Sequence, residues 1–344
     1  MEKKDNKPLL VNTSKTSLKT SEEIFQEYTK ALKEKRYPSE KIAKKQKEVT
    51  LMDDRVLEAV FSDNKNNPLL AGIANAMRKI HNLTPIAKVL NSQVEKTSIW
   101  DVLFGRKMIA DLIGEGEKAF NSGKINITAE VQKEQAEAFA TRGTLSSGNV
   151  MRTGFEKGAD YSMAPDVIGI NILGFKLPEL HYTETFCSRI VRTNFDAPKN
   201  FFLADKYSDY YLEIPKLGKK EQFDEKYHEL WDILQVFKTT IENQEEDIRM
   251  GVITSPIAME LSREFKVATG DPHMIEQLLT EDEFRAMLAQ HDLNVLNKGH
   301  NEGRVEGAEK NATETAIEML NRNYDPVQIS EILRRPIEWV NKLM

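Results

Sequence analysis

The segment DVIGINILGF, residues 166–175, constrains the fold more than any other, because it is an almost unbroken apolar run rich in Ile and Val. A run of this composition and length is typical of a β-strand that is buried on both of its faces. Such a strand belongs in the interior of a sheet. The chain must therefore supply both neighbouring strands and the layers that cover them.

The segments around this strand supply the neighbouring strands and the covering helices. Apolar residues with helical spacing occupy residues 21–37 and, in two pieces broken at 63–68, residues 52–81. A helix-length segment also separates residues 132 and 166. Strand-like patterns occur at residues 85–93, 107–115, 124–132, 184–193 and 209–217. This order predicts an α/β fold with a mixed β-sheet flanked by helices.

Beyond residue 217 the chain becomes helical and acidic. The stripe of Leu230, Ile233, Leu234 and Phe237 predicts a core-facing helix, and glycines at every fourth position from 299 to 307 predict a flexible, charged helix rather than a packing motif. Four parts are expected. They are a polar, basic tail and helix at 1–48, the α/β core at 49–218, an acidic helical region at 219–296, and a charged helical tail with terminal short helices at 297–344.

Composition limits the class of protein. Charged residues make up 30% of the 344 residues, no apolar run is long enough for a bilayer, and the first residues carry no secretory signal. Cys187 is the only cysteine, so no intrachain disulfide can form. These features predict a cytoplasmic protein with no membrane partner. The six histidines show no metal-binding spacing, so a histidine-built zinc site is not expected.

The net charge of −6 is unevenly distributed. Residues 1–50 hold 13 Lys and Arg against 8 Asp and Glu, whereas the remainder holds 35 against 46. An acidic body does not by itself indicate nucleic-acid binding. Any contact with DNA must therefore come from a local basic patch.

One pair of acidic residues falls in a predicted hairpin. Asn-Ser-Gly at 121–123 is a turn signal between the strands 107–115 and 124–132. A hairpin centred near residues 120 and 121 places Asp111 opposite Glu130, with Cβ atoms about 4.5–5.5 Å apart. Two carboxylates at that distance repel by about 3 kcal/mol in an effective dielectric constant of roughly 20. A shared proton or a metal cation would neutralise this repulsion.

Gln132 lies on the same strand face as Glu130, because strand side chains alternate between faces. Carboxylates, an amide oxygen and backbone carbonyls are ligands that suit Mg²⁺ or Mn²⁺. The alternative is a hairpin with two solvent-exposed acids. A register slip of one residue would send Asp111 to the other face.

These segments resemble the Asp…Glu-x-Gln core of the PD-(D/E)XK nuclease superfamily and, more narrowly, its recombination-promoting nuclease and transposase family. The resemblance extends to Arg142 in FATRGTLSSG, to the GFEKGADYSMAPDVIGINILGF segment, to LEIPKL, and to MDDRVLEAVFSDN with Asp54. It covers residues 50–218 well and 297–344 loosely. It implies a restriction-endonuclease-like core. The superfamily's usual Lys is Gln132 here, as is common in this family, and Lys133 substitutes for it only if the strand ends at Gln132 and the chain turns there.

The resemblance also implies roles. Asp111, Glu130 and the Val131 carbonyl would bind Mg²⁺ or Mn²⁺, and Gln132 would orient the attacking water or the phosphate. Phosphate contacts are implied for Arg142 and Lys216, against the alternatives of a salt bridge and a solvated strand-end charge. Asp54 is an auxiliary candidate whose alternative is a helix cap.

Three functions remain open on the sequence alone. The first is a metal-dependent DNA endonuclease that hydrolyses phosphodiester bonds and is linked to DNA recombination or mobile elements. The second is a catalytically weak or inactive DNA- or protein-binding module on the same fold. The third is an interaction protein that forms homo-oligomers through its helical C-terminal region. Two short terminal helices, with Ile329, Ile332 and Leu333 on one face and Arg334 and Arg335 at the turn, are expected to dock or self-associate rather than read DNA.

Overall fold

The structure is a computed structural model that describes residues 21–34, 36–61, 66–94, 112–119, 123–134, 150, 165–191 and 206–344. The chain divides into two compact units. One comprises residues 34–279, and the other comprises the described residues before 34 together with residues 280–344. The four-part division expected from the sequence stays a prediction.

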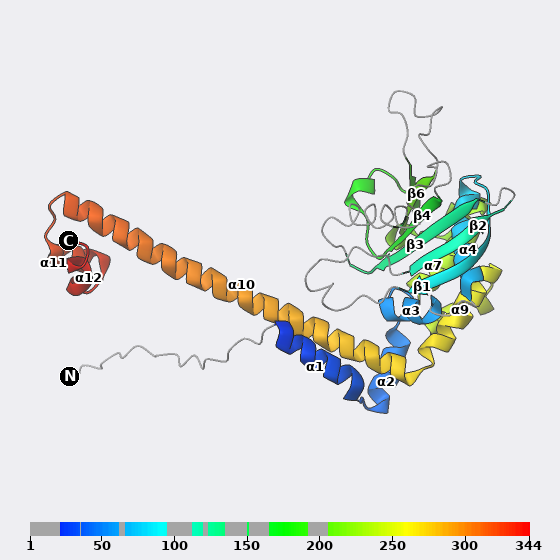
Figure 1. Ribbon diagram of the computed structural model, residues 1–344, viewed down its shortest axis with the longest axis horizontal. Helices are drawn as coiled ribbons and strands as arrows, with labels where there is room; N and C mark the ends of the chain where they lie inside the picture. Colours follow the sequence, from blue (N-terminus) through cyan, green and yellow to red (C-terminus); the bar gives the residue numbers. More distant parts are fainter. Residues whose placement is uncertain are drawn as a thin grey trace, which may run out of the picture. The chain divides into compact units, whose positions relative to one another are not determined.

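The larger unit is built on a six-stranded sheet in the order β1-β2-β3-β4-β6-β5 (Figure 1). The strands β1, β2 and β3 are antiparallel, β3, β4 and β6 are parallel, and β5 pairs antiparallel with β6. The sheet is therefore mixed, as expected. The strand bounds are β1 Ile86–Val94, β2 Leu112–Lys118, β3 Lys124–Gln132, β4 Asp166–Leu173, β5 Cys187–Ile190 and β6 Tyr207–Glu213.

Helices cover one face of this sheet and form the main core with it. Helix α4 packs against β1 and α7, α7 packs against α9, and α3 packs against α9 (Figure 1). All four residues of the predicted stripe on α7 are buried, so the expectation of a core-facing helix is confirmed. The helix bounds in this unit are α2 Ser39–Glu48, α3 Asp54–Phe61, α4 Asn67–Ile80, α7 Glu225–Lys238, α8 Ile241–Arg249 and α9 Pro256–Thr269.

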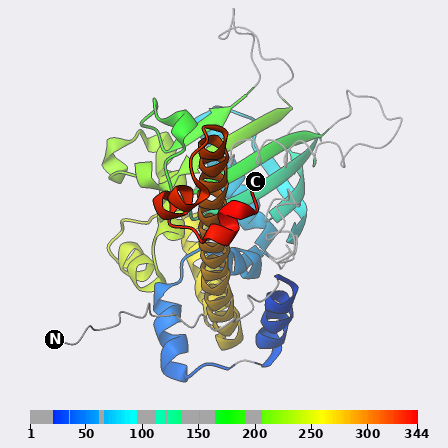
Figure 2. The same ribbon diagram turned by 90° about the vertical axis from the view of Figure 1, so that its left-hand side faces the viewer.

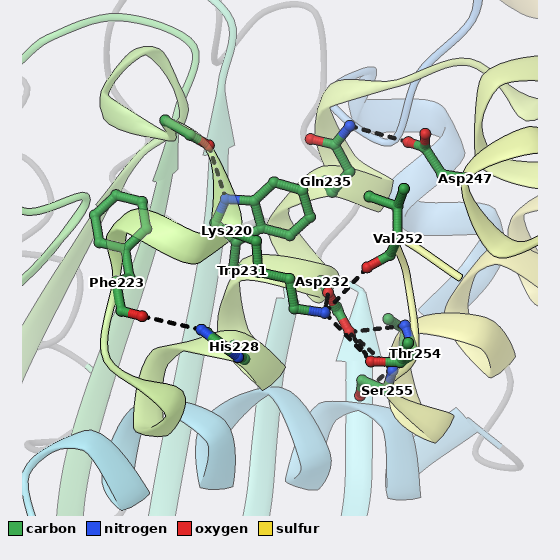
Figure 3. A network of polar contacts seen from close by, with 12 residues as sticks. Lys220, Phe223, His228, Trp231, Asp232, Gln235, Asp247, Val252, Thr254 and Ser255 are labelled. Atoms are coloured by element: carbon green, nitrogen blue, oxygen red, sulfur yellow. Dashed lines mark hydrogen bonds and ion pairs between the residues drawn. The ribbon is translucent and has the colours of Figure 1, made fainter. Parts of the chain in front are cut away.

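A buried aspartate fixes the join between α7 and α9 (Figure 3). Asp232 on α7 accepts hydrogen bonds at Oδ2 from the backbone N–H groups of Thr254 and Ser255, at 2.9 and 2.8 Å. The Lys220 ammonium lies 2.5 Å from Asp232 Oδ1. Since these backbone groups precede the first turn of α9, the carboxylate satisfies donors that the helix itself leaves unpaired.

The smaller unit contains α1 Ser21–Glu34, most of α10 Pro272–Asn321, α11 Pro326–Leu333 and α12 Ile337–Asn341. The two short helices lie beside the C-terminal end of α10 (Figure 1, Figure 2), where Ala316, Ile329 and Val340 form a small core. The glycines at 299, 303 and 307 have no neighbouring atoms within reach of an added Cβ, as expected for a segment without a packing motif. None of the helices in the described ranges is long and apolar enough to cross a membrane.

One detail of the terminal helices differs from the prediction. Ile329 is buried and Leu333 packs beside it, but Ile332 is 59% exposed. Ile329 and Leu333 are four residues apart and share the face of α11 that packs in this small core, whereas Ile332 lies outside that face. At the turn, Glu309 pairs with Arg335 and accepts a 2.7 Å hydrogen bond from the Trp339 indole. Arg335 therefore has a packing role in this unit.

Candidate active site

Strand β3 separates an apolar face from a polar face. Ile125, Ile127, Ala129 and Val131 belong to the main core under the helices. The alternate side chains, Asn126, Thr128, Glu130 and Gln132, therefore point to the opposite face. Glu130 is only 7% exposed, so its carboxylate lies in a protected environment rather than in open solvent.

The neighbouring strands extend this polar face. Partners in a ladder point to the same side, so Asn171 on β4, which pairs with Glu130, lies beside it. Asn171 donates a 3.1 Å hydrogen bond from Nδ2 to the Tyr210 carbonyl. Further along, Asp209 on β6 accepts a 2.6 Å hydrogen bond from the Tyr207 hydroxyl. Sequence reasoning missed Asn171 and Asp209 on this face, although the alternation in YSDYYLE indicates that Asp209 lies on one face of its strand.

The register of the β2–β3 hairpin agrees with the prediction. Leu112 pairs with Ala129, Ile113 with Thr128 and Glu117 with Lys124. This is the register that was used to set Asp111 opposite Glu130. Asp111 itself lies outside the described residues, as do the turn at 120–122 and Arg142. The opposition of the two carboxylates stays a prediction.

The chain turns immediately after Gln132, where β3 ends. The Gln132 carbonyl accepts a 2.8 Å hydrogen bond from the backbone N–H of Gly174. A Cβ atom at Gly174 would lie 2.5 Å from the Lys133 carbonyl oxygen, so this close approach requires glycine. The strand thus ends at Gln132 and the chain turns there, so Lys133 need not point to the face opposite Gln132.

Lys133 uses this turn to reach the start of α3. Its ammonium lies 2.7 Å from Asp53 Oδ1. Asp53 also accepts a hydrogen bond from the Thr50 N–H at 3.0 Å, and its carbonyl accepts the first helical bonds of α3. The cap is therefore Asp53. Asp54 is the first residue of α3, and its side chain lies outside the described part of the structure.

Lys216 has a buried side chain, which argues against the alternative of a solvated strand-end charge, and its phosphate contact stays a prediction. Its side chain is 4% exposed and that of Glu213 is 0% exposed. The Lys216 ammonium donates to Glu213 Oε2 at 2.6 Å and to the Leu180 carbonyl at 2.8 Å. Glu213 Oε1 accepts from the Leu177 N–H at 2.7 Å. These bonds engage the ammonium inside the protein, so we expect Lys216 to stabilise the end of β6.

Two further titratable groups outside the polar face have altered acidity. Burial raises the pKa of the Cys187 thiol to about 12. Burial, with the positive charges of Arg189 and Lys226, lowers the pKa of His81 to about 4. Cys187 is therefore a small buried side chain and not a nucleophile at neutral pH.

The end of β3 offers oxygen donors suited to a hard divalent cation, namely the Glu130 carboxylate, the Val131 carbonyl and the Gln132 amide. Within the described ranges no group of three His, Cys, Asp or Glu side chains is arranged to hold a metal. The donor set thus fits Mg²⁺ or Mn²⁺ in chemistry and needs a second carboxylate, for which Asp111 is the candidate.

Comparison with known proteins identifies the family. Neither the curated proteins nor the solved structures give a significant match to the chain. The model of one family, described as PD-(D/E)XK nuclease family transposase, matches residues 51–286, which include the whole sheet and the helices that cover it. A match over more than half of the chain, on a mixed sheet whose third strand ends in Glu130 and Gln132, places this protein in the PD-(D/E)XK nuclease transposase family.

Proposed function

We propose that the protein is a metal-dependent DNA endonuclease that hydrolyses phosphodiester bonds and acts in DNA recombination or on mobile elements. The observation that carries the proposal is the protected Glu130 beside Gln132 on the polar face at the end of β3, in a chain of this nuclease family. The single cysteine and the charged composition suit a cytoplasmic enzyme.

The metal ligands are proposed to be Asp111, Glu130 and the Val131 carbonyl. The observed hairpin register supports this set, since one more pair beyond Leu112 and Ala129 would set Asp111 opposite Glu130. A bound Mg²⁺ or Mn²⁺ supplies Lewis acidity, which lowers the pKa of water and offsets charge on the scissile phosphate. The charge of the cation also removes the repulsion between the two carboxylates.

The remaining residues of the chain would position the reactants. Gln132 is neutral and donates and accepts hydrogen bonds, so it suits the orientation of a water or a phosphate oxygen. Arg142 is proposed as a phosphate contact, where a guanidinium matches two phosphate oxygens. Asp54, at the first position of α3, is retained only as an auxiliary acid.

A second candidate function, a non-catalytic DNA- or protein-binding module, is favoured by one specific observation. The position of the superfamily's lysine holds Gln132, and the ammonium of the next residue, Lys133, is paired with Asp53. The Lys133 ammonium is therefore directed at Asp53 in the contacts of the described residues. The two functions differ in whether the protein breaks a phosphodiester bond.

Cleavage of supercoiled plasmid DNA separates the two. Wild-type protein should nick or linearise the plasmid with Mg²⁺ or Mn²⁺ and lose this activity in EDTA. Glu130→Gln keeps the shape of the side chain but removes the anionic ligand, so it should abolish cleavage. Glu115→Gln is the matched control, because Glu115 lies on β2, in register with Asn126 on the same face, and should retain activity. A Glu130→Gln variant as active as wild type would refute the catalytic assignment.

A further inference from the structure

Asn171 is the ladder partner of Glu130 on β4, and the proposed function gives it no role. Its partners on the two neighbouring strands are Glu130 on β3 and Tyr211 on β6. Neighbouring strands lie about 4.8 Å apart, and ladder partners point to the same face of a sheet. The Asn171 amide therefore lies beside the carboxylate that is proposed to bind the metal.

This asparagine is buried in an otherwise apolar strand. In VIGINIL, residues 167–173, Asn171 carries the one polar side chain, and it is 3% exposed. Next to it on the polar face begins a small apolar cluster, formed by Leu173, Leu177, Leu180 and Tyr211. Burial of an amide costs free energy unless both of its ends find hydrogen-bond partners. The partners of the Asn171 amide are therefore informative.

The described residues satisfy the nitrogen end of this amide and not its oxygen end. Asn171 Nδ2 donates the 3.1 Å hydrogen bond to the Tyr210 carbonyl. Because a carbonyl oxygen only accepts, this bond identifies the nitrogen and leaves Oδ1 as the other end of the amide. No donor among the described residues reaches Asn171 Oδ1. A buried oxygen of this kind calls for a water or an ion as its partner.

An ionised carboxylate also only accepts hydrogen bonds, so the Glu130 carboxylate cannot act as the donor to Asn171 Oδ1. A divalent cation satisfies both side chains, because Mg²⁺ keeps several of its waters when protein carboxylates bind it. From this geometry we infer that Asn171 is a positioning residue of the metal site, which accepts a hydrogen bond at Oδ1 from a water of the cation. The inference rests on the proposed binding of a metal by Glu130.

The order of the strands favours contact through a water over direct binding of the metal. β3 lies between β2 and β4, and the proposed ligand Asp111 directly precedes β2. Asn171 is therefore one strand farther from Asp111 than Glu130 is, and a water extends the reach of the cation by one hydrogen bond. Neutrality also suits this position, because the carboxylates of Asp111 and Glu130 already match the double charge of the cation.

Titration of the full chain with Mn²⁺ tests this inference without DNA and without cleavage, through the electron paramagnetic resonance signal of the free ion. Wild-type protein should bind Mn²⁺ saturably, and Glu130→Gln should remove that binding. Asn171→Leu keeps the approximate volume of the side chain but removes the acceptor, so it should weaken Mn²⁺ binding about fivefold or more. Asn171→Asp keeps an acceptor and adds a negative charge, so it should bind Mn²⁺ at least as tightly as wild type.

The two Asn171 variants separate this role from a purely structural one, because both lose the donor to the Tyr210 carbonyl. Asn171→Ala removes the same acceptor with a smaller side chain and should weaken Mn²⁺ binding as Asn171→Leu does. Asn126→Leu is the matched control. Asn126 is also buried on the polar face of β3, four residues before Glu130, and its replacement should change the Mn²⁺ affinity by less than about twofold. Far-UV circular dichroism without metal establishes that each variant is folded.

The outcomes distinguish the role of Asn171 from the metal site itself. Unchanged Mn²⁺ affinity in folded Asn171→Leu or Asn171→Ala, with binding lost in Glu130→Gln, would overturn the role of Asn171 and leave the proposed metal site in place. Equal weakening in Asn171→Leu and Asn171→Asp would also overturn it, because the residue would then only join β4 to β6. Wild-type protein without saturable Mn²⁺ binding, or Glu130→Gln with undiminished binding, would overturn the proposed metal site and the inference together.

Discussion

Replacement of Lys216 by methionine tests whether this lysine is structural or contacts DNA. Methionine keeps most of the length and the apolar stem of the side chain but removes the ammonium. The fully buried Glu213 carboxylate then loses its cationic partner, and the Leu180 carbonyl loses its donor. The substitution therefore leaves a buried charge and a buried acceptor unsatisfied.

Removal of one partner of a buried ion pair costs about 3–5 kcal/mol. Glu213 keeps the hydrogen bond from the Leu177 N–H, so the lower end, about 3 kcal/mol, is expected for Lys216→Met. A double variant that adds Glu213→Gln removes the buried charge while an amide oxygen still accepts from Leu177. It should regain about 1–2 kcal/mol relative to Lys216→Met.

Urea denaturation followed by far-UV circular dichroism gives these free energies of unfolding. Lys176→Met is the control, because Lys176 is exposed in the segment after β4 that also contains Leu177 and Leu180, and its loss should change stability by less than about 0.5 kcal/mol. The salt dependence of DNA binding should be the same for folded Lys216→Met and for wild type. A loss below about 1 kcal/mol, together with a reduced salt slope, would show that Lys216 contacts DNA after all.

The single thiol, the buried histidine and the C-terminal helices give further tests. Native protein should leave Cys187 unlabelled by a thiol reagent at neutral pH and react fully in urea, since burial raises the pKa of the Cys187 thiol to about 12; rapid labelling of native protein would contradict the burial. The pKa of His81 is lowered from 6.5 to about 4 in the folded chain, so the unfolded chain takes up a proton at His81 at a higher pH than the folded chain does. The free energy of unfolding should therefore decrease as the pH drops from about 6.5 to about 4. His81→Gln should lose this part of the decline in urea midpoints, and an identical pH profile would exclude His81 as its source. Deletion of residues 310–344 should alter the oligomeric state, measured on a sizing column, or the solubility more than the affinity for short duplex DNA. A larger effect on the affinity for duplex DNA than on the oligomeric state would assign the terminal helices to DNA binding.

Local patterns in the sequence predict the strands of the sheet and one of its registers. Alternation in KINITAEVQ gives β3 its exact bounds, and the Asn-Ser-Gly turn gives the pairing with β2, because both are properties of neighbouring residues. The strand order is different. β6 lies between β4 and β5, although β5 comes first in the chain. That placement depends on long-range packing, which no local pattern encodes.

The candidate site was predictable where it depends on strand alternation and was missed where it depends on tertiary contact. Glu130 and Gln132 share the polar face, as period two requires. Lys216 was expected to be a solvated charge or a phosphate contact because it stands at a strand end, whereas its burial comes from the 177–180 segment folding over the end of β6. The Asp53–Lys133 pair joins residues 80 apart, so no local pattern indicates it.

The energetics of that pair bear on the missing lysine of the superfamily. Lys133 is 53% exposed, and ion pairs of this kind contribute about 1 kcal/mol or less. Asp53 keeps its hydrogen bond from Thr50 without Lys133, so separation of the pair leaves the cap of α3 in place. Breaking the pair therefore costs little stability, and we expect a phosphate that reaches the end of β3 to compete with Asp53 for the Lys133 ammonium. The turn after Gln132, made possible by the close approach of Gly174, thus supplies a cation at the end of β3, next to the position where Gln132 replaces the superfamily's lysine.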